Sequence, residues 1–308
     1  MKIERVVVGI DFSPPSVDAA HWVSRYFAPG AELVLAHVIS IPDPPPIGRG
    51  KFARRDLLID TVREGAEKKL REISLSLGAD RVWLELREGE PAECLTALAE
   101  DFSAGLVVAG AHGERAGLLE RLGSTADRLV RASTRPVLLV TQPRLTTPRH
   151  ILVPLEKPDH ATGALTWASA LSQRDGARIT AIHVVAGSVA TSALAALPDV
   201  SGAPPADVTA PLTVAEGADR WVERAVAAGV PREQANSEVV TGERTREILA
   251  AARRLDVDLI VMARRGPGNL RRAVLGSVVE GVLRDASCPV LVVPDESARA
   301  STRHGDHD

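Results

Sequence analysis

The stretch "LGSTADRLVRASTRPVLLV", Leu122–Val140, joins a glycine and two hydroxyl residues to a helical segment and then to a short apolar run. A glycine followed by Ser and Thr is typical of a helix N-terminus, and the apolar run after a proline suits a buried strand. The same order returns as "LGSVVEGVLRDASCPVLVV", Leu275–Val293. The chain therefore encodes this helix–strand unit twice.

The repetition extends over the rest of the chain. "RVVVGID" (Arg5–Asp11) is echoed by "HILVPLE" (His150–Glu156), and "ELVLAHV" (Glu32–Val38) by "RITAIHV" (Arg178–Val184). Repetition of several segments in the same order in the two halves of the chain indicates a duplicated domain. We predict domains at residues 1–143 and 149–295, a short extended linker between them, and a disordered tail at 296–308.

Apolar runs alternate with helical patterns within each copy. In the first copy we expect strands at 3–10, 32–39, 81–86, 105–110 and 136–141, and helices from Ser13 to about Ala28, at 55–77, at 91–102 and at 123–132. This alternation requires right-handed crossovers, so the predicted fold is α/β, with two tandem Rossmann-like, doubly wound parallel sheets. Ligands of such sheets bind outside the carboxyl ends of the strands.

Composition limits the function classes. The 308 residues are 45% hydrophobic with a net charge of −3, which fits a globular protein of about two domains without a basic surface for nucleic acid or an anionic membrane. The first apolar run is too short for a signal peptide or a membrane span, so we expect a cytoplasmic protein. The two cysteines, Cys94 and Cys288, form no pair with metal or disulfide spacing, and we expect small buried hydrophobes.

A glycine motif follows the strand at 105–110. It reads Gly110-x-x-Gly113, nine residues, then Gly123, Ser124 and Thr125 at the start of a helix. Glycine allows positive φ and close backbone approach, and the amides and hydroxyls of a helix N-terminus attract anions. The motif is neither a P-loop, since Gly50-Lys51 is followed by Phe52, nor a G-x-G-x-x-G fingerprint. Phosphate is the predicted ligand.

With this spacing, the chain resembles the UspA-like universal stress proteins, whose ATP-binding signature has the same glycine pattern. The likeness covers nearly the whole chain as two tandem domains. It implies a fold related to adenine-nucleotide α-hydrolases, dimerisation through the last strand of each copy, and a role in stress survival or its regulation.

The resemblance also implies roles for particular residues of the first copy. Asp11 would bond the adenine or ribose, Val38 would line the adenine pocket, and Gly110 would pass close to the ribose. The phosphates would be held by Gly113, Gly123, Ser124 and Thr125. Mg²⁺ commonly bridges phosphates in such sites, although the sequence shows no protein cage for it. Two alternatives stay open: Asp11 as turn chemistry, and Arg115 as either a phosphate ligand or a solvated loop cation.

The second copy keeps part of the motif. Gly266, nine residues, Gly276 and Ser277 are present, with Glu156 and Val184 in the places of Asp11 and Val38. Ala263 replaces Gly110 and adds a Cβ, and Val278 replaces Thr125 and removes a hydroxyl. Arginines such as Arg264 add charge around the loop. We therefore predict one tight ATP site per chain and a weaker second site.

Function and assembly leave alternatives. We favour an ATP-binding regulatory protein over an enzyme, because the motif supplies donors but no convincing base for hydrolysis. The alternatives are a slow ATP hydrolase using the same pocket and a sensor of AMP or another nucleotide. The apolar runs 136–140 and 289–293 are association hazards unless paired, which predicts an intramolecular pseudo-twofold dimer and leaves a homodimer open. The sequence names no regulatory protein partner.

Overall fold

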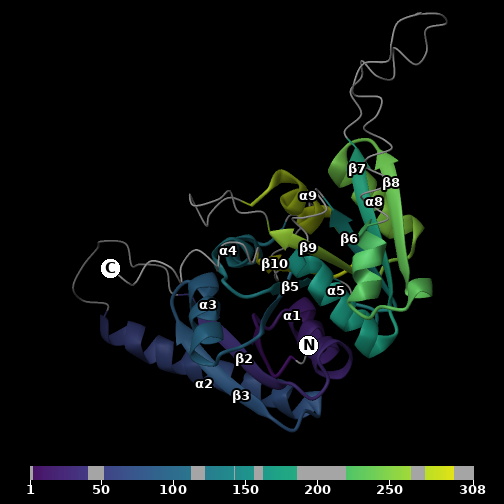
Figure 1. The fold of residues 1–308 in the computed structure, drawn as a ribbon. Helices are drawn as coiled ribbons and strands as arrows, with labels where there is room; N and C mark the ends of the chain where they lie inside the picture. The colour runs from purple at the N-terminus through teal and green to yellow at the C-terminus, as the bar shows by residue number, and fades with distance from the viewer. Residues whose placement is uncertain are drawn as a thin grey trace, which may run out of the picture. The chain divides into compact units, whose positions relative to one another are not determined.

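A computed structural model describes residues 3–40, 52–111, 122–141, 143–155, 162–185, 220–264 and 275–294. The chain divides into two compact units, the first ending at Thr147 and the second beginning at Pro148. Figure 1 shows strands and helices alternating along each unit. The expected domain boundaries stay a prediction, and the tail 296–308 lies outside the described residues.

The first unit contains five parallel strands in the order β3-β2-β1-β4-β5. They are β1 (Arg5–Gly9), β2 (Glu32–Ile39), β3 (Val82–Glu88), β4 (Leu106–Gly110) and β5 (Val137–Val140). The order moves one way from β1 and then the other, which defines a doubly wound sheet. The carboxyl ends of β2, β1 and β4 are therefore neighbours at one edge.

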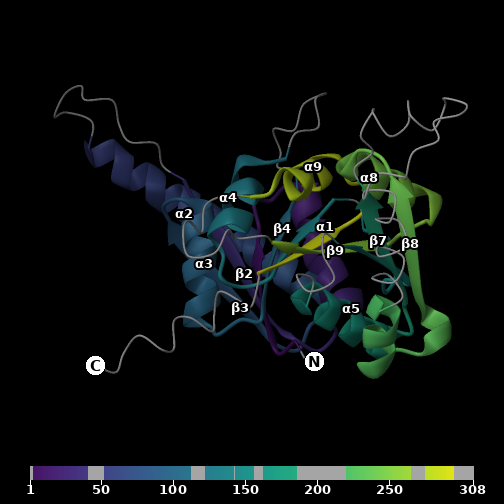
Figure 2. The ribbon, with the colours of Figure 1, turned by 45° about the horizontal axis from the view of Figure 1, so that its top comes forward.

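Four helices connect these strands. They are α1 (Pro14–Trp22), α2 (Phe52–Leu77), α3 (Pro91–Asp101) and α4 (Ser124–Ala132). Helix α1 packs beside α2 and α3 beside α4, as Figure 2 also shows for α3 and α4. Right-handed crossovers then place the two pairs on opposite faces of the sheet.

The second unit repeats this arrangement with strand order β10-β9-β6-β7-β8. Its strands are β6 (His150–Leu155), β7 (Arg178–Val185), β8 (Ala235–Thr241), β9 (Leu259–Arg264) and β10 (Val290–Pro294). Its helices are α5 (Thr162–Asp175), residues 220–227, the 3₁₀ turn η3 (Arg232–Gln234), α8 (Arg244–Arg254) and α9 (Ser277–Asp285). The predicted pair of tandem, doubly wound α/β domains is confirmed, whereas pairing of the last strands stays a prediction.

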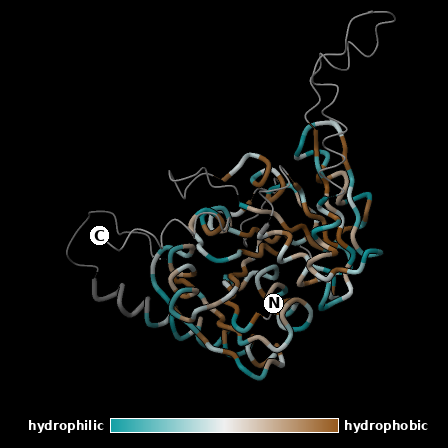
Figure 3. Tube along the Cα trace, in the orientation of Figure 1, coloured by the Kyte–Doolittle hydropathy of each residue, from teal (hydrophilic) through white to brown (hydrophobic). Residues whose placement is uncertain are grey.

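The core of each unit lies in its central strands, where Val7 and Ile260 are fully buried. Figure 3 shows the apolar residues gathered in these strands, with hydrophilic residues along the outer helices. Such continuous burial explains why the strands read as unbroken Val, Ile and Leu runs. Cys288 is buried as expected, but Cys94 is only half-buried, and its thiol donates to the carbonyl oxygen of Glu88.

The structure refines the predicted helices in three places. The helix expected through Ala28 changes after Trp22 into a five-residue π-helical turn, η1 (Val23–Phe27). Ser13 precedes α1 as predicted, but its side chain does not cap the helix. On α2, Ala66 and Leu70 face the core, whereas Val62 is 43% exposed. No helix in the described ranges is long and apolar enough to cross a membrane.

Candidate functional site

The start of α4 is attached to the end of β4 in the first unit. The N–H of Gly123 donates to the carbonyl oxygen of Ala111 over 3.0 Å, and the N–H of Ala111 donates to that of Val140 over 2.9 Å. Gly110, the last residue of β4, pairs with Val140 in the sheet. These contacts hold both ends of the glycine motif at the carboxyl edge of the sheet, where parallel α/β sheets bind ligands.

The N-terminus of α4 presents backbone donors without a side-chain cap. Gly123 is the N-cap residue, and its carbonyl oxygen accepts the N–H of Asp127 over 3.0 Å. Ser124 is exposed and Thr125 half-buried, so two hydroxyls lie in the first turn. Donors at an uncapped N-terminus, together with the helix dipole, favour a negative group there.

The glycines of the motif do not use the left-handed region. Gly123 has φ −61° and ψ 142°, and Gly110 is not among the described glycines with positive φ. Our expectation that positive φ explains these glycines is therefore wrong at both positions. What glycine contributes there is the absence of a side chain beside the strand end and the helix start.

Asp11 follows β1 and takes part in a tight turn. One carboxylate oxygen accepts the N–H of Ser13 over 3.0 Å and also its hydroxyl, which explains why Ser13 does not cap α1. The N–H of Asp11 donates to the Ser16 hydroxyl over 3.3 Å. Asp11 therefore stabilises a turn, as one of the two alternatives from the sequence predicts. Among the described residues its second carboxylate oxygen accepts no hydrogen bond, and Asp11 is exposed.

Val38 lies half-buried near the end of β2, beside a histidine that sequence reasoning missed. The Nδ1 atom of His37 lies 2.7 Å from the carbonyl oxygen of Ile10, the residue before Asp11. Burial lowers the pKa of His37, opposed by the bond to Ile10 and by the charge of Asp11. The sequence did contain a signal for His37, because the second strand of each copy has a histidine directly before the valine ("AHV" and "IHV").

An aromatic residue in an unusual conformation completes this region. Phe12 has φ 66°, in the left-handed region that bulky residues rarely adopt. Its ring lies 4.3 Å from that of His37 between centroids, and Lys69 Nζ lies 5.2 Å from the ring centroid. Composition and spacing gave no signal for Phe12 or Lys69, because the conformation and these contacts arise only in the folded chain.

The described part of the first site thus comes from three adjacent strand ends and one helix start. Asp11 follows β1, Val38 is the residue before the last of β2, and Gly110 ends β4, with β1 between the other two strands. Gly113 and Arg115 lie outside the described residues. No group of three or more His, Cys, Asp or Glu side chains that could hold a metal occurs in the part of the chain that the structure describes.

The second unit has the same backbone frame. Gly276 caps α9 with φ −65° and ψ 142°, and its carbonyl oxygen accepts the N–H of Glu280 over 3.0 Å. Ala263 pairs with Val293 as Gly110 pairs with Val140. Ser277 is exposed and Val184 buried. Glu156 and Gly266 lie outside the described residues, so the described difference between the copies is one of side chains.

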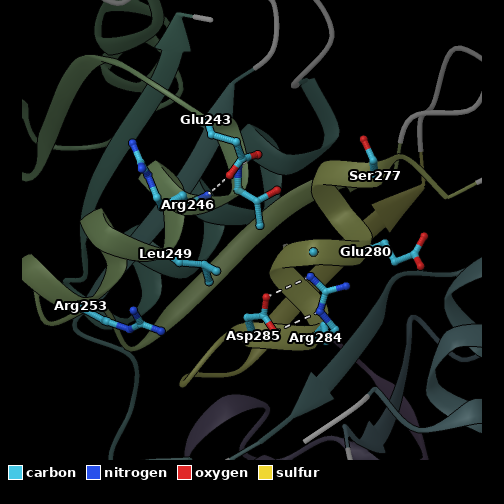
Figure 4. A pocket seen from close by; sticks show the side chains of 10 residues that line it. Glu243, Arg246, Leu249, Arg253, Ser277, Glu280, Arg284 and Asp285 are labelled. Carbon is cyan, nitrogen blue, oxygen red and sulfur yellow. Dashed lines mark hydrogen bonds and ion pairs between the residues drawn. The ribbon is translucent and has the colours of Figure 1, made fainter. Parts of the chain in front are cut away.

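A groove of about 620 Å³ runs between α8 and α9, which lie side by side in Figures 1 and 2. Figure 4 shows Leu249 between the helices and Arg284 beside Asp285, to which it is bonded over 3.1 Å. Arg246 is likewise paired, with Glu247 at 2.9 Å. Cations and carboxylates balance in this groove, so its charge favours neither an anion nor a cation.

A glycine lines this groove where the first copy has an arginine. In the first unit, Arg128 of α4 bonds Glu90 at the start of α3 over 3.3 Å. The repeat places Gly281 where the first copy has Arg128. Gly281 lets α9 approach α8 closely at Thr245, because a Cβ there would lie 2.7 Å from the Thr245 methyl carbon. At this position the second unit therefore has close helix packing in place of the ion pair of the first unit.

Comparison with known proteins gives consistent results. A model of the universal stress protein family matches residues 2–141 and 147–294. A universal stress protein of Thermus aquaticus is 34% identical over 143 residues, 46% of this chain and 96% of that protein. One from Mycobacterium tuberculosis is 26% identical over 309 residues, 93% of this chain and 95% of that protein. The crystal structure of one from Archaeoglobus fulgidus aligns with a TM-score of 0.67 and 21% identity over 96% of this chain and 97% of that one, which supports the fold.

Proposed function

The chain belongs to the universal stress protein family, and from this premise we propose that its first domain binds ATP as a regulatory ligand. The observation that carries the proposal is the bond from Gly123 to Ala111, which holds an uncapped helix N-terminus at the end of a central strand. Backbone amides fixed in this way need no reorganisation to receive a phosphate.

The phosphates are proposed to lie at the start of α4. There the amides of the first turn and the hydroxyls of Ser124 and Thr125 donate to phosphate oxygens. Gly113 and Arg115 belong to the proposal from the sequence motif, Gly113 through close backbone approach and Arg115 through its charge. Mg²⁺ would be held chiefly by the phosphate oxygens, because it keeps most of its water ligands in such sites.

The nucleoside is proposed to lie across the ends of β1, β2 and β4. The second carboxylate oxygen of Asp11 accepts a hydrogen bond from a ribose hydroxyl or the adenine amino group. Val38 supplies an apolar wall for the base, and Gly110 allows the ribose to approach the backbone. The neighbouring order of the three strands supports this division of roles.

We propose binding rather than turnover as the primary function. Hydrolysis of ATP needs a base beside the attacking water. Asp127, a carboxylate in the first turn of α4, is engaged by Arg131 over 2.9 Å, and Ser124 and Thr125 are not bases at neutral pH. A slow hydrolase remains the second candidate, and AMP is the competing ligand that a titration distinguishes.

The test is calorimetric titration of nucleotide-free protein with ATP and with AMP, each with Mg²⁺. Asp11→Asn keeps an oxygen for Ser13 but removes the charge, and Ser124→Ala removes one donor. Each should weaken ATP binding by about 1 kcal/mol, or roughly fivefold. Ser277→Ala in the second domain is the matched control and should leave the tight site unchanged. Unaltered ATP affinity in both first-domain variants would refute this location for the site.

A further inference from the structure

We propose that His37 is a positioning residue of the ATP site, acting on Asp11 through the residues on either side of it. The inference rests on the proposed function and extends it. His37 contacts Ile10 through a hydrogen bond of 2.7 Å and Phe12 through its ring, at 4.3 Å between centroids. One side chain from β2 therefore restrains both neighbours of the carboxylate that follows β1.

The hydrogen bond fixes the role of each ring nitrogen. A carbonyl oxygen only accepts, so Nδ1 of His37 must carry the proton and donate to Ile10. Nε2 is then the acceptor in the neutral ring, and no described side chain bonds it. The bond adds to the sheet pairing of β1, whose last residue, Gly9, pairs with Ala36 of β2. The N–H of Ile10 already donates to the carbonyl oxygen of Ala36 over 2.8 Å, so the His37 bond adds a second restraint to the residue directly before Asp11, on its carbonyl oxygen.

The ring contact restrains the residue after Asp11. Phe12 has φ 66°, a conformation that persists in a bulky residue only when its surroundings impose it. On the side of α2 its neighbours leave a pocket of about 310 Å³, lined in part by Lys69 and Ile73. The closer restraint on Phe12 is therefore the ring of His37. Without that ring, only the turn from Asp11 to Ser13 holds the φ of Phe12, and the direction of the Asp11 carboxylate is less tightly fixed.

The same bond recurs in the second unit. Nδ1 of His183 lies 2.9 Å from the carbonyl oxygen of Leu155, the residue before Glu156. Two copies that differ at most surrounding positions keep a histidine at this place with the same backbone partner. The bond is therefore a property of the strand end itself, and His183 supplies an internal control for general effects on folding.

Three variants separate the two contacts. His37→Ala removes both and should weaken ATP binding about tenfold. His37→Asn places an amide N–H near the position of Nδ1, keeps a donor for Ile10 but not the ring, and should recover part of the affinity. His37→Phe keeps only the ring contact and should recover less. His183→Ala should leave the tight site unchanged.

Two further readouts distinguish positioning from general damage. Inorganic tripolyphosphate probes the phosphate end alone, so its affinity should be the same in wild type and His37→Ala. In the Asp11→Asn background, His37→Ala should weaken ATP binding little further, because His37 acts on the ligand only through the Asp11 carboxylate. Three results would each overturn the proposal. They are an equal loss of affinity for ATP and tripolyphosphate in His37→Ala, additive losses of ATP affinity in the double variant, and no recovery of ATP affinity in His37→Asn. If Asp11→Asn weakens ATP binding and His37→Ala does not, only the positioning role fails; if wild type binds no ATP, the proposed function fails first.

Discussion

The N–H of Gly123 donates to the carbonyl oxygen of Ala111 over 3.0 Å, and this bond joins the start of α4 to the end of β4. Ala111 follows the first glycine of the motif and Gly123 begins its second half, so the bond joins the two ends of the segment between them. A loop closed in this way has already lost the entropy of bringing its ends together. The first domain therefore keeps its helix N-terminus in place without a ligand.

Replacing Gly123 by proline tests this bond directly. Its φ of −61° is close to the value that proline fixes, so Gly123→Pro removes the N–H without forcing the backbone of that residue. We expect the variant to lose about 1 kcal/mol of stability and to bind ATP at least fivefold more weakly. Gly123→Ala keeps the N–H and should unfold like wild type in denaturant. Equal stability and ATP affinity for the proline and alanine variants would show that the bond contributes nothing.

Phe12 offers a test of backbone strain. Phe12→Ala removes the ring but keeps a Cβ in the left-handed region, whereas Phe12→Gly removes both. Left-handed backbone costs a residue with a Cβ about 1 kcal/mol relative to glycine. The free energy of unfolding should therefore be about 1 kcal/mol higher for the glycine variant than for the alanine variant. The reverse order, measured by urea unfolding, would indicate that residue 12 does not adopt positive φ.

The strand and helix order was predictable because it depends on local patterns. Runs such as Val6–Val8 are buried on both faces, and continuous burial produces continuous hydrophobicity. Gly123 before Ser124 marked a helix start for the same local reason. These features need no knowledge of which strands pair.

The details of the candidate site were less predictable because they depend on register. His37 and Ile10 are 27 residues apart, and their bond exists only because β1 and β2 pair in one particular alignment. Ser13 directly precedes α1, where a serine side chain commonly caps a helix, but its hydroxyl donates to Asp11 two residues earlier instead. Periodicity predicts which residues are buried, whereas contacts of this kind follow from where the backbone places them.

The packing of α8 against α9 gives a third prediction. A Cβ at Gly281 would lie 2.7 Å from the methyl carbon and 3.0 Å from the hydroxyl oxygen of Thr245. Gly281→Ala should therefore lower the free energy of unfolding by about 1–3 kcal/mol, despite the better helix propensity of alanine.

A second substitution provides the control for this packing argument. Thr245→Ala removes both of the atoms that the new Cβ would meet, so the double variant Thr245→Ala, Gly281→Ala should recover the stability lost by Gly281→Ala. A double-mutant cycle with a coupling energy near zero would contradict the close approach of these helices.

His150 predicts how stability depends on pH. Its Nδ1 lies 3.0 Å from the carbonyl oxygen of Leu255 and its Nε2 lies 2.8 Å from the Thr180 hydroxyl. Burial lowers the pKa of His150 below its ordinary value of 6.5, opposed by the bond to Leu255. The unfolded chain therefore takes up a proton below about pH 6.5 while the folded chain does not. The stabilisation is complete above that pH and is lost as pH falls toward the lower folded pKa.

The measurement is urea unfolding between pH 7.5 and pH 5. Wild type should lose stability over this range, and His150→Gln should show a smaller loss because residue 150 no longer titrates. Burial lowers the pKa of His21 and His37 as well, so part of the slope should remain in the variant. An identical slope in both proteins would show that His150 is protonated equally in the folded and unfolded states.

The two copies predict an unequal pair of nucleotide sites. Both have the same helix start, since Gly123 and Gly276 differ little in φ and ψ. Among the described residues the difference lies in side chains: Ala263 adds a Cβ near the end of β9, and Val278 lacks the hydroxyl of Thr125. Because Gly110 does not use positive φ, the expected effect of Ala263 is steric alone. Each change costs on the order of 1 kcal/mol, which together gives about a tenfold weaker second site.

Titration of nucleotide-free wild-type protein should therefore give a stoichiometry of about one tight ATP per chain. The variant Glu156→Asp, Ala263→Gly, Val278→Thr restores the side chains of the first copy at these three positions and should raise the stoichiometry toward two, because the described backbone frame is already present. The matched reverse changes, Gly110→Ala and Thr125→Val, should weaken the first site by about the same factor. Two equal tight sites in the wild-type protein would show that the second domain tolerates these substitutions and that side chains at these positions do not set the affinity.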